Sequence, residues 1–267
     1  MGRFTRRALI KGALFRSVAT ALALALYVTC GLAQPRCGSN EYDAHGQVAY
    51  VYDGDTVRLE DGRKVRIVGI DTPELGKDGQ PAQPYAEEAR QALVTLVADN
   101  PSVRLRYARQ PRDRYGRLLA HLYLADGRSV AEVQLASGYA TALVIPPNVW
   151  NQSCYAAVEQ EALRARTGIW ALPAYQPAPA ESLPPSAHGF HIVSGRIERI
   201  GESRHSLWLE LGPRLVLRVA RSDLQYFSGY DPRQLLHHTV VARGWLHYHK
   251  QQLSMRIRHP AALSVGK

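Results

Sequence analysis

The sequence predicts a mostly β protein with helices, an α+β fold, built as two β-rich domains. Three observations support this prediction. Short runs of apolar residues alternate with polar residues, as in strands with one buried face. Other segments carry apolar residues at helical spacing. A Pro- and Ala-rich stretch at 172–189 has neither period and divides the 267-residue chain into two parts, each long enough to bury a core.

The part before this stretch is expected to contain both strands and helices. The predicted strands are 47–60, 64–70, 103–109 and 117–124. The predicted helices are 85–97, 129–138 and 153–166. A turn at Asp61-Gly62 separates the first two strands, and residues 75–84, which combine Gly, Pro and polar groups, are expected to form a loop.

The part after the stretch contains only short alternating runs. The predicted strands are 192–200, 206–211, 214–219, 238–246 and 252–257. Short strands at this density are typical of a small β-barrel or sandwich. We therefore predict a first domain at 34–171, a semi-extended linker at 172–189 and a second, all-β domain at 190–267.

The formal net charge of +10 is unevenly distributed. Residues 1–33 carry five basic groups and no acid, residues 34–189 have a net charge of −2, and residues 190–267 have a net charge of +7. A basic C-terminal part suggests an anionic partner, for example nucleic acid. Ordinary solvated surface charge is the alternative interpretation.

Residues 1–33 resemble an export signal. A basic stretch at 3–11 precedes an apolar run at 18–33 that ends in small residues, which is typical of a cleaved secretory signal. Arg6-Arg7 also resembles the twin-arginine type of bacterial signal. We expect a periplasmic or secreted protein without stable membrane insertion. An uncleaved anchor is the alternative, although the run is slightly shorter than the roughly 20 residues of a membrane span.

Cysteine usage agrees with export. Cys30 lies inside the predicted signal, so the mature chain would keep Cys37 and Cys154. Two cysteines in an oxidising compartment favour one disulfide between them. Two unrelated buried thiols are the alternative.

Candidate chemistry lies in three segments of the first domain: YDGDTVRL (52–59), VRIVGIDTPE (65–74) and RDRYGR (112–117). Hydrolysis of a phosphodiester requires groups that stabilise the developing negative charge, an activated water and usually a metal ion. Carboxylates at strand ends and arginines that grip two phosphate oxygens meet these needs. The candidates are Asp55, Asp71, Glu74, Arg66 and Arg117. Each segment taken alone is also compatible with an ordinary turn or solvated strand.

Together and in this order, the three segments resemble the signature of the staphylococcal nuclease family. The resemblance covers about 47–170 and implies a five-stranded oligonucleotide-binding barrel with three helices. It implies a calcium-dependent nuclease acting on DNA and RNA. Asp55, Asp71 and the backbone carbonyl of Thr72 would hold Ca²⁺. Glu74 would act as general base or orient the attacking water.

The resemblance also implies the contacts to substrate. Arg66 and Arg117 would clamp the phosphate, and Arg114 and Tyr115 would contact the substrate's terminal phosphate. The stretch 141–146, TALVIP, lacks two tyrosines that frame a base in the family's type member, and the loop at 76–84 is shorter. These departures leave the preference between DNA and RNA open.

The second domain resembles the small barrel found behind nuclease domains in some exported bacterial proteins. It could bind nucleic acid through Arg243, Arg256 and Arg258, with Trp245 or Tyr248 as a stacking platform. The alternative places Trp245 in the core and the arginines in solvent. Two other functions remain open from sequence. One is a catalytically inactive nucleic-acid-binding module. The other is an envelope-anchored structural protein.

Overall fold

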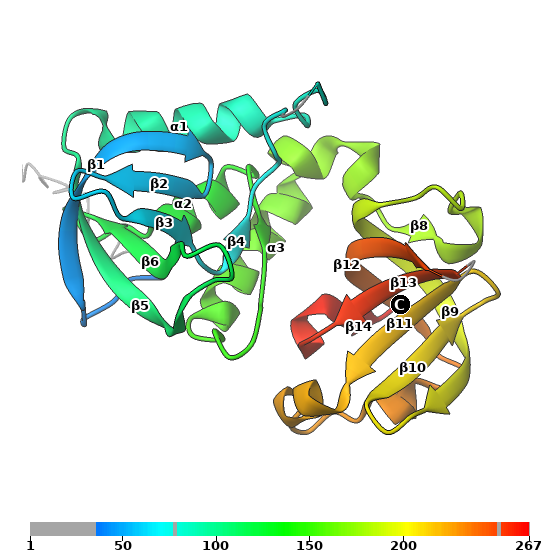
Figure 1. Ribbon diagram of the computed structural model, residues 1–267. Helices are drawn as coiled ribbons and strands as arrows, with labels where there is room; N and C mark the ends of the chain where they lie inside the picture. Colours follow the sequence, from blue (N-terminus) through cyan, green and yellow to red (C-terminus); the bar gives the residue numbers. More distant parts are fainter. Residues whose placement is uncertain (1–35, 77–78, 250–251, 267) are drawn as a thin grey trace, which may run out of the picture. The chain divides into compact units, whose positions relative to one another are not determined.

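The computed structural model describes residues 36–76, 79–249 and 252–266, so the predicted export signal lies outside the described residues. Gln34–Lys267 forms one compact unit. Its described residues form two sheets that each close on themselves and a small two-stranded sheet (Figure 1). No helix among the described residues has the length and apolar character needed to cross a membrane.

The first sheet is a closed barrel with the strand order β1-β2-β3-β6-β5. Its strands are β1 (Ala44–Asp53), β2 (Thr56–Leu59), β3 (Lys64–Ile67), β5 (Ser102–Arg112) and β6 (Leu118–Leu124). The β3–β6 pair is parallel and the other pairs are antiparallel. Strands β4 (Ile70–Asp71) and β7 (Thr141–Ala142) form a separate antiparallel pair that is not part of the barrel.

Two predicted strands are each divided by a turn, so their boundaries were wrong. The strand expected at 47–60 is the hairpin β1–β2, because the side chain of Asp53 accepts a hydrogen bond from the N–H of Asp55 and closes a turn. The strand expected at 64–70 ends at Ile67. Gly69 then adopts φ 91°, and a Cβ there would lie 2.4 Å from the ring of Tyr155.

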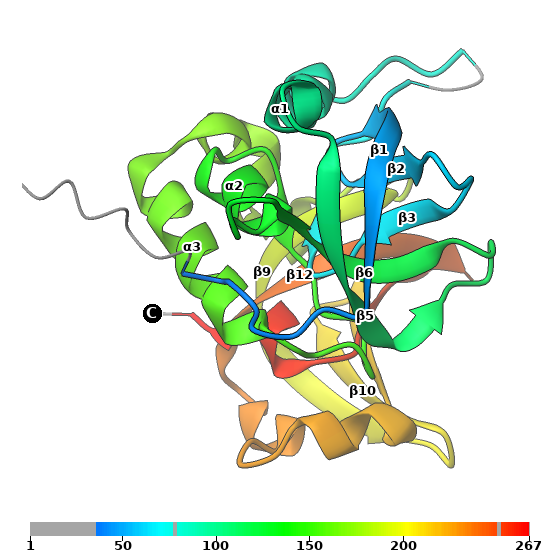
Figure 2. The ribbon, with the colours of Figure 1, turned by 90° about the vertical axis from the view of Figure 1, so that its left-hand side faces the viewer.

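Three helices pack along one side of the barrel (Figure 2). They are α1 (Ala86–Ala98), α2 (Val130–Ala136) and α3 (Gln152–Ala165). Helix α1 buries Ala86, Ala89, Leu93 and Val97, which are spaced three to four residues apart and so lie on one face of the helix. Helix α2 begins at Ser129, whose hydroxyl accepts a hydrogen bond from the N–H of Glu132.

The second sheet has the strand order β14-β12-β13-β11-β10-β9-β8, and an additional pairing of β12 with β9 closes it. Its strands are β8 (Ala178–Pro179), β9 (Gly189–Glu202), β10 (Ser206–Leu211), β11 (Leu215–Ala220), β12 (Thr239–His249), β13 (Gln252–Ile257) and β14 (Leu263–Val265). The second sheet contains one parallel pair within the closed part, β11–β13, which corresponds to the parallel pair β3–β6 of the first barrel. Both barrels therefore share one strand order, that of an oligonucleotide-binding fold.

The segment 172–189 is not the semi-extended linker that its composition suggested. Strand β8 pairs with β9, and Ala180, Leu183 and Ala187 are buried in the core of the second barrel. Short 3-10 helices at Pro173–Tyr175 and Ala180–Ser182 provide the bends between these contacts. The prolines therefore shape a packed segment.

The predicted fold class is confirmed. The described residues contain a closed five-stranded barrel with helices and a second barrel-like sheet, and the chain is mostly β.

Candidate active site

The carboxylates and arginines predicted from sequence meet at one end of the first barrel. They come from the β1–β2 turn, strand β3, strand β4 and the turn between β5 and β6. A cavity of about 290 Å³ opens there. Its lining contains Tyr52, Asp53, Asp55, Thr56, Lys64, Arg66, Asp71, Glu74, Leu75 and Arg117.

Asp55 is fixed by hydrogen bonds to the residue after β4. Its Oδ2 accepts from the backbone N–H and from the hydroxyl of Thr72, each at 3.0 Å. Its Oδ1 accepts from the hydroxyl of Thr56 at 3.0 Å. These bonds join the β1–β2 turn to the DTPE segment, so two pieces of chain far apart in sequence are held around one cavity.

Arg66 lies between two carboxylates. Its Nε is 3.1 Å from Oδ1 of Asp55, and its Nη2 is 2.9 Å from Oδ1 of Asp71. Nη1 donates to the backbone carbonyl of Ile70 at 2.9 Å. Burial alone would lower the pKa of Arg66, but the neighbouring carboxylates outweigh burial and raise it. The guanidinium is therefore charged and held in a fixed orientation.

Two carboxyl groups of the cavity have raised pKa values, mainly because they are buried. Burial raises the pKa of Asp71 to about 7, although Arg66 opposes the shift and Asp55 and Glu74 add to it. Burial and the charge of Asp55 raise the pKa of Asp53 to about 6. Such a group of carboxylates is stabilised by an additional cation.

Arg117 is positioned by the turn that carries it. Its Nε donates to Oδ2 of Asp113 at 2.7 Å, and its backbone N–H donates to Oδ1 of the same residue at 2.9 Å. Gly116 adopts φ 78° in this turn. The exposed Arg114 and Tyr115 are adjacent, and Arg114 donates to the Tyr115 hydroxyl at 2.5 Å.

Glu74 lines the same cavity from the segment after β4. Its backbone N–H donates to the side chain of Gln83 at 2.9 Å, and its carbonyl accepts from the N–H of Gln83. This pair of bonds closes the base of the 75–84 loop. The loop therefore holds the backbone of Glu74 while its side chain remains at the cavity.

The first barrel is similar in sequence to known proteins. Residues 64–172 match the model of the family described as staphylococcal nuclease homologue. The chain is 39% identical over 127 residues to thermonuclease of Staphylococcus intermedius, a match covering 46% of this chain and 74% of that protein. The chain belongs to the staphylococcal nuclease family.

Other relatives carry the same activity in their names. Thermonuclease of Staphylococcus hyicus is 36% identical over 136 residues, covering 49% of this chain and 79% of that protein. Endonuclease YncB of Bacillus subtilis (strain 168) is 38% identical over 128 residues, covering 46% of this chain and 60% of the relative. This chain is a nuclease, an enzyme that hydrolyses phosphodiester bonds.

The structure brings the predicted residues of the nuclease together and adds two that the sequence argument did not name. Asp53 lines the cavity beside Asp55, and Asp113 orients Arg117. Both were visible in the motifs, as the first Asp of YDGD and the Asp of RDRYGR. Alternation along a strand does not identify which of two neighbouring carboxylates faces a site when a turn intervenes.

The donor set fits a hard cation only in part. No group of three or more His, Cys, Asp or Glu in the described part of the chain is arranged to hold a metal ion. The expected ligand set includes only two carboxylates, Asp55 and Asp71, with a carbonyl and water as the other donors. Ca²⁺ prefers oxygen donors of these kinds. The observation that favours a cation here is the group of carboxylates that line one cavity.

Proposed function

We propose that this nuclease depends on calcium and cleaves DNA and RNA at the cavity formed by Asp55, Arg66, Asp71, Glu74 and Arg117. The observation that carries the proposal is that both arginines and all three carboxylates line one cavity. Phosphodiester hydrolysis needs positive charge on the phosphate oxygens and a group that activates water. This cavity offers both within one small volume.

Arg66 and Arg117 bind the scissile phosphate and stabilise the charge that develops in the transition state. A guanidinium suits this role because it donates in two parallel directions to phosphate oxygens. Asp113 orients Arg117, whereas Arg66 is paired with Asp55 and Asp71. Arg114 and Tyr115 contact the terminal phosphate of the substrate from the same turn.

Glu74 accepts a proton from the attacking water or orients that water. Asp55, Asp71 and the backbone carbonyl of Thr72 hold Ca²⁺. When bound, Ca²⁺ supplies positive charge to the phosphate and to the water beside it. The contacts from Thr72 to Asp55 support this assignment, because they fix the DTPE segment next to the carboxylate that shares the ion.

The direct test is degradation of DNA and RNA by the purified chain with calcium present and after chelation. Cleavage that requires calcium supports the proposal. Unchanged cleavage in excess chelator contradicts the metal assignment but leaves the nuclease activity intact. Binding without cleavage, with calcium present, contradicts the catalytic roles of the five residues.

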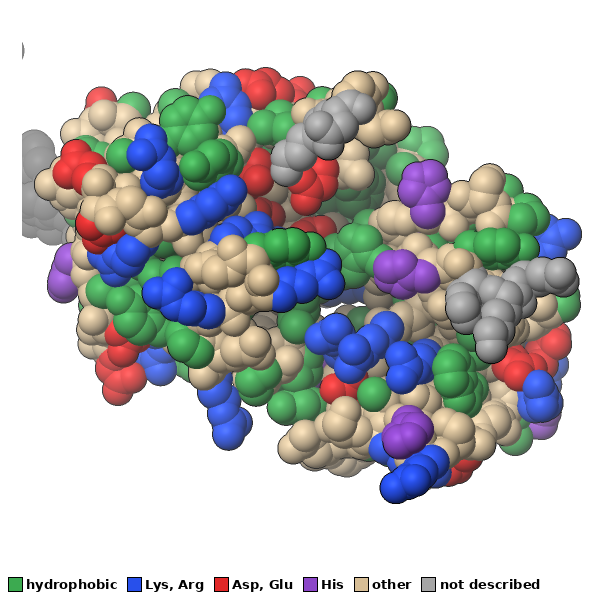
Figure 3. Space-filling view, viewed as in Figure 1, with side chains coloured by type: hydrophobic (Ala, Val, Ile, Leu, Met, Phe, Trp, Pro, Cys, Tyr) green, Lys and Arg blue, Asp and Glu red, His purple; other side chains and the backbone are tan. Residues whose placement is uncertain are grey.

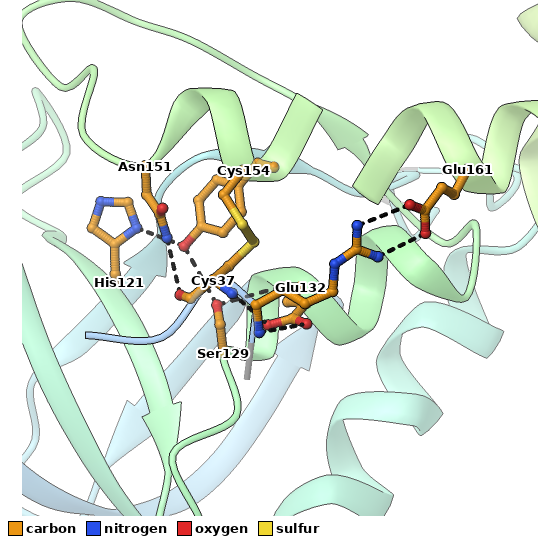
Figure 4. Close-up of a disulfide and its surroundings, with 9 residues drawn as sticks. Cys37, His121, Ser129, Glu132, Asn151, Cys154 and Glu161 are labelled. Atoms are coloured by element: carbon orange, nitrogen blue, oxygen red, sulfur yellow. Dashed lines mark hydrogen bonds and ion pairs between the residues drawn. A yellow bond between two sulfur atoms is a disulfide. The ribbon is translucent and has the colours of Figure 1, made fainter. Parts of the chain in front are cut away.

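We also propose that the protein is exported to the periplasm or the medium. The structure joins Cys37 to Cys154 by a disulfide, and such bonds persist in oxidising compartments (Figure 4). Fractionation of cells that produce the full chain, with determination of the N-terminus of the product, tests both export and removal of residues 1–33. A product found only in the cytoplasm with a reduced cysteine pair contradicts this proposal.

A further inference from the structure

A second and larger cavity adjoins the catalytic groups and is shared by the two barrels. Its volume is about 710 Å³. Arg66, Asp71, Glu74 and Arg117 line it from the first barrel. Two side chains of the second barrel, Trp245 and Arg258, line the same cavity. Lys and Arg side chains gather on this face of the molecule, on both barrels (Figure 3).

Strand β12 is anchored to the nuclease barrel two residues before Trp245. Nη1 of Arg243 is 2.7 Å from Oε2 of Glu159 on α3, and Nη2 donates to the carbonyl of Ala142 at 3.1 Å. Glu159 is 1% exposed and also accepts from the N–H of Ala142. Arg243, one of three arginines expected to contact nucleic acid, therefore joins the two barrels instead.

A row of aromatic rings in mutual contact leads from Trp245 to a buried cluster. Trp245 lies edge-to-face with Phe190 at 5.5 Å between ring centroids. Tyr175 follows at 6.2 Å from Phe190, and Trp170 at 6.0 Å from Tyr175. Phe190 and Tyr175 pack on the cluster that contains the buried Trp170. The half-buried indole of Trp245 is thus held rigidly at the cavity wall, which limits the entropy lost when a ligand stacks on it.

Arg258 has a charge that its surroundings do not balance. Among the described residues it makes no hydrogen bond or ion pair, whereas its neighbour Arg256 donates to Asp223 at 2.8 Å. Burial and the positive charge of Arg256 lower the pKa of Arg258, and Asp223 offsets only part of this effect. An anion in the cavity would stabilise the charged guanidinium.

In the described lining of this cavity, the stretch that follows β7 contributes no aromatic side chain, and the exposed Tyr115 is the aromatic residue that the nuclease barrel contributes. The residues there that line the cavity are Leu143, Ile145, Pro146 and Asn148. A planar aromatic ring stacks on any unpaired base, because every base has a π-face. Trp245 supplies such a surface from the second barrel.

We propose that Trp245 and Arg258 form a subsite for single-stranded nucleic acid, in which Trp245 stacks on a base and Arg258 contacts a backbone phosphate beside the scissile bond. This subsite rests on the proposed function, since the strand must also lie across Arg66 and Arg117. The second barrel is then part of the substrate cleft. A single strand is the expected occupant because a paired base in a duplex exposes no face to the indole.

Point variants of the full chain test the subsite better than deletion of the second barrel, because deletion would leave Glu159 buried without its cation. The test variants are Trp245→Ala, Trp245→Phe, Arg258→Ala and Arg258→Lys. The matched controls are Trp208→Ala and Arg204→Ala, which lie on the same barrel outside the cavity lining. Thermal unfolding of each variant identifies any that are destabilised.

Two measurements are made with a single-stranded oligonucleotide. One is KM for cleavage with calcium, and the other is Kd from fluorescence anisotropy of the labelled oligonucleotide in chelator. We expect Trp245→Ala to raise both about tenfold, within the roughly five- to hundred-fold range of lost base stacking, and Trp245→Phe to retain most of the affinity. Arg258→Ala should also reduce the slope of log Kd against log salt by about 0.7, the value for one phosphate contact on a single strand. Arg258→Lys should keep most of that slope.

The outcomes separate the two proposals. Wild-type KM and Kd in both alanine variants, with cleavage intact, overturn the subsite and leave the proposed function standing. Losses equal to those of Trp208→Ala and Arg204→Ala also overturn it, because they indicate a general effect of the barrel. If the wild-type chain cleaves neither DNA nor RNA, the proposed function fails, and the Kd values still decide whether Trp245 and Arg258 bind a strand. An equal loss for duplex and single strand overturns the stacking role.

Discussion

Asp113 holds Arg117 at two points: Oδ2 accepts from Nε at 2.7 Å and Oδ1 accepts from the backbone N–H at 2.9 Å. Burial alone would raise the pKa of Asp113, but the hydrogen bonds from Arg117 and the turn outweigh burial and lower it. One edge of the guanidinium is therefore held by Asp113, and Arg117 lines both the catalytic cavity and the larger cavity beside it. A guanidinium held in a fixed orientation can donate two hydrogen bonds to phosphate oxygens with less loss of entropy than a mobile side chain.

The first prediction follows from this orientation. Arg66→Lys and Arg117→Lys keep the charge but lose the planar pair of donors, so each should lower kcat by about 10²-fold or more. Asp113→Asn should lower kcat less, because it frees Arg117 without removing it. Steady-state kinetics on single-stranded DNA measure all three. Near wild-type rates in both lysine variants would place the phosphate clamp elsewhere.

The second prediction concerns calcium. Asp55→Asn retains the size of the side chain but removes one of the two proposed carboxylate ligands, so it should abolish calcium-dependent cleavage. Calcium binding measured by isothermal titration calorimetry should weaken in parallel, which gives a readout independent of turnover. Glu60→Gln, at an exposed position outside the cavity, is the matched control. Calcium affinity equal to wild type in Asp55→Asn contradicts the ligand assignment.

The third prediction concerns Glu74. Glu74→Gln removes the proton acceptor, and we expect kcat to fall about 10²-fold or more while KM changes little. Because Glu74 is exposed and the substitution leaves its backbone hydrogen bond to Gln83 in place, we expect the fold to be retained. Circular dichroism and thermal unfolding check that the loss is chemical. A variant that keeps the wild-type kcat removes Glu74 from the mechanism.

Periodicity and the family resemblance together predicted the fold class, and the motifs named residues that line one cavity. The alternation in strands and the stripe of α1 report burial, which is a local property of the sequence. The turns inside 47–60 and 64–70 were missed because their Gly and Asp residues interrupt the alternation too briefly to stand out. The motifs were informative because the chemistry of a site restricts residue types more than packing does.

The relation between the barrels could not be predicted in this way. Arg243 and Glu159 are far apart in sequence, and the motif that contains Arg243 suggested a contact to nucleic acid, so nothing local indicated their ion pair. The composition of 172–189 suggested an open linker, whereas Leu183 and Ala187 are buried. Long-range pairing of single residues depends on how two surfaces meet, which no periodicity encodes.

The fourth prediction concerns the disulfide, which ties the segment before β1 to the start of α3 (Figure 4). The two cysteines are 117 residues apart, so the chain-entropy model gives a stabilisation of about 4–5 kcal/mol. Cys154→Ser should lower the free energy of unfolding, measured in urea, by up to that amount. Intact mass of the alkylated, unreduced mature protein, which lacks Cys30, should show no labelled thiol. Two labelled thiols would rule out the bond.

The fifth prediction concerns His121, which is 3% exposed and lies near the same disulfide (Figure 4). Its Nδ1 is 2.9 Å from the Tyr155 hydroxyl, and its ring packs edge-to-face on Trp150 at 4.7 Å. Burial, with a smaller contribution from the charge of Arg106, lowers the pKa of His121 from 6.5 to about 3. The folded state therefore keeps this imidazole neutral.

The sign of the effect on stability follows from the two pKa values. Below pH 6.5 the unfolded chain binds a proton at His121 that the folded chain does not, so the free energy of unfolding falls as the pH is lowered toward about 3. The expected contribution is about 1.4 kcal/mol per pH unit.

Urea unfolding of wild type and His121→Gln from about pH 7 to about pH 4 measures this contribution. The carboxylates titrate in both proteins, so their effect cancels in the difference between the two free energies of unfolding. The wild type should lose stability more steeply than His121→Gln, whereas the exposed control His205→Gln should follow the wild type. Parallel curves for wild type and His121→Gln would show that His121 takes up a proton in the folded state.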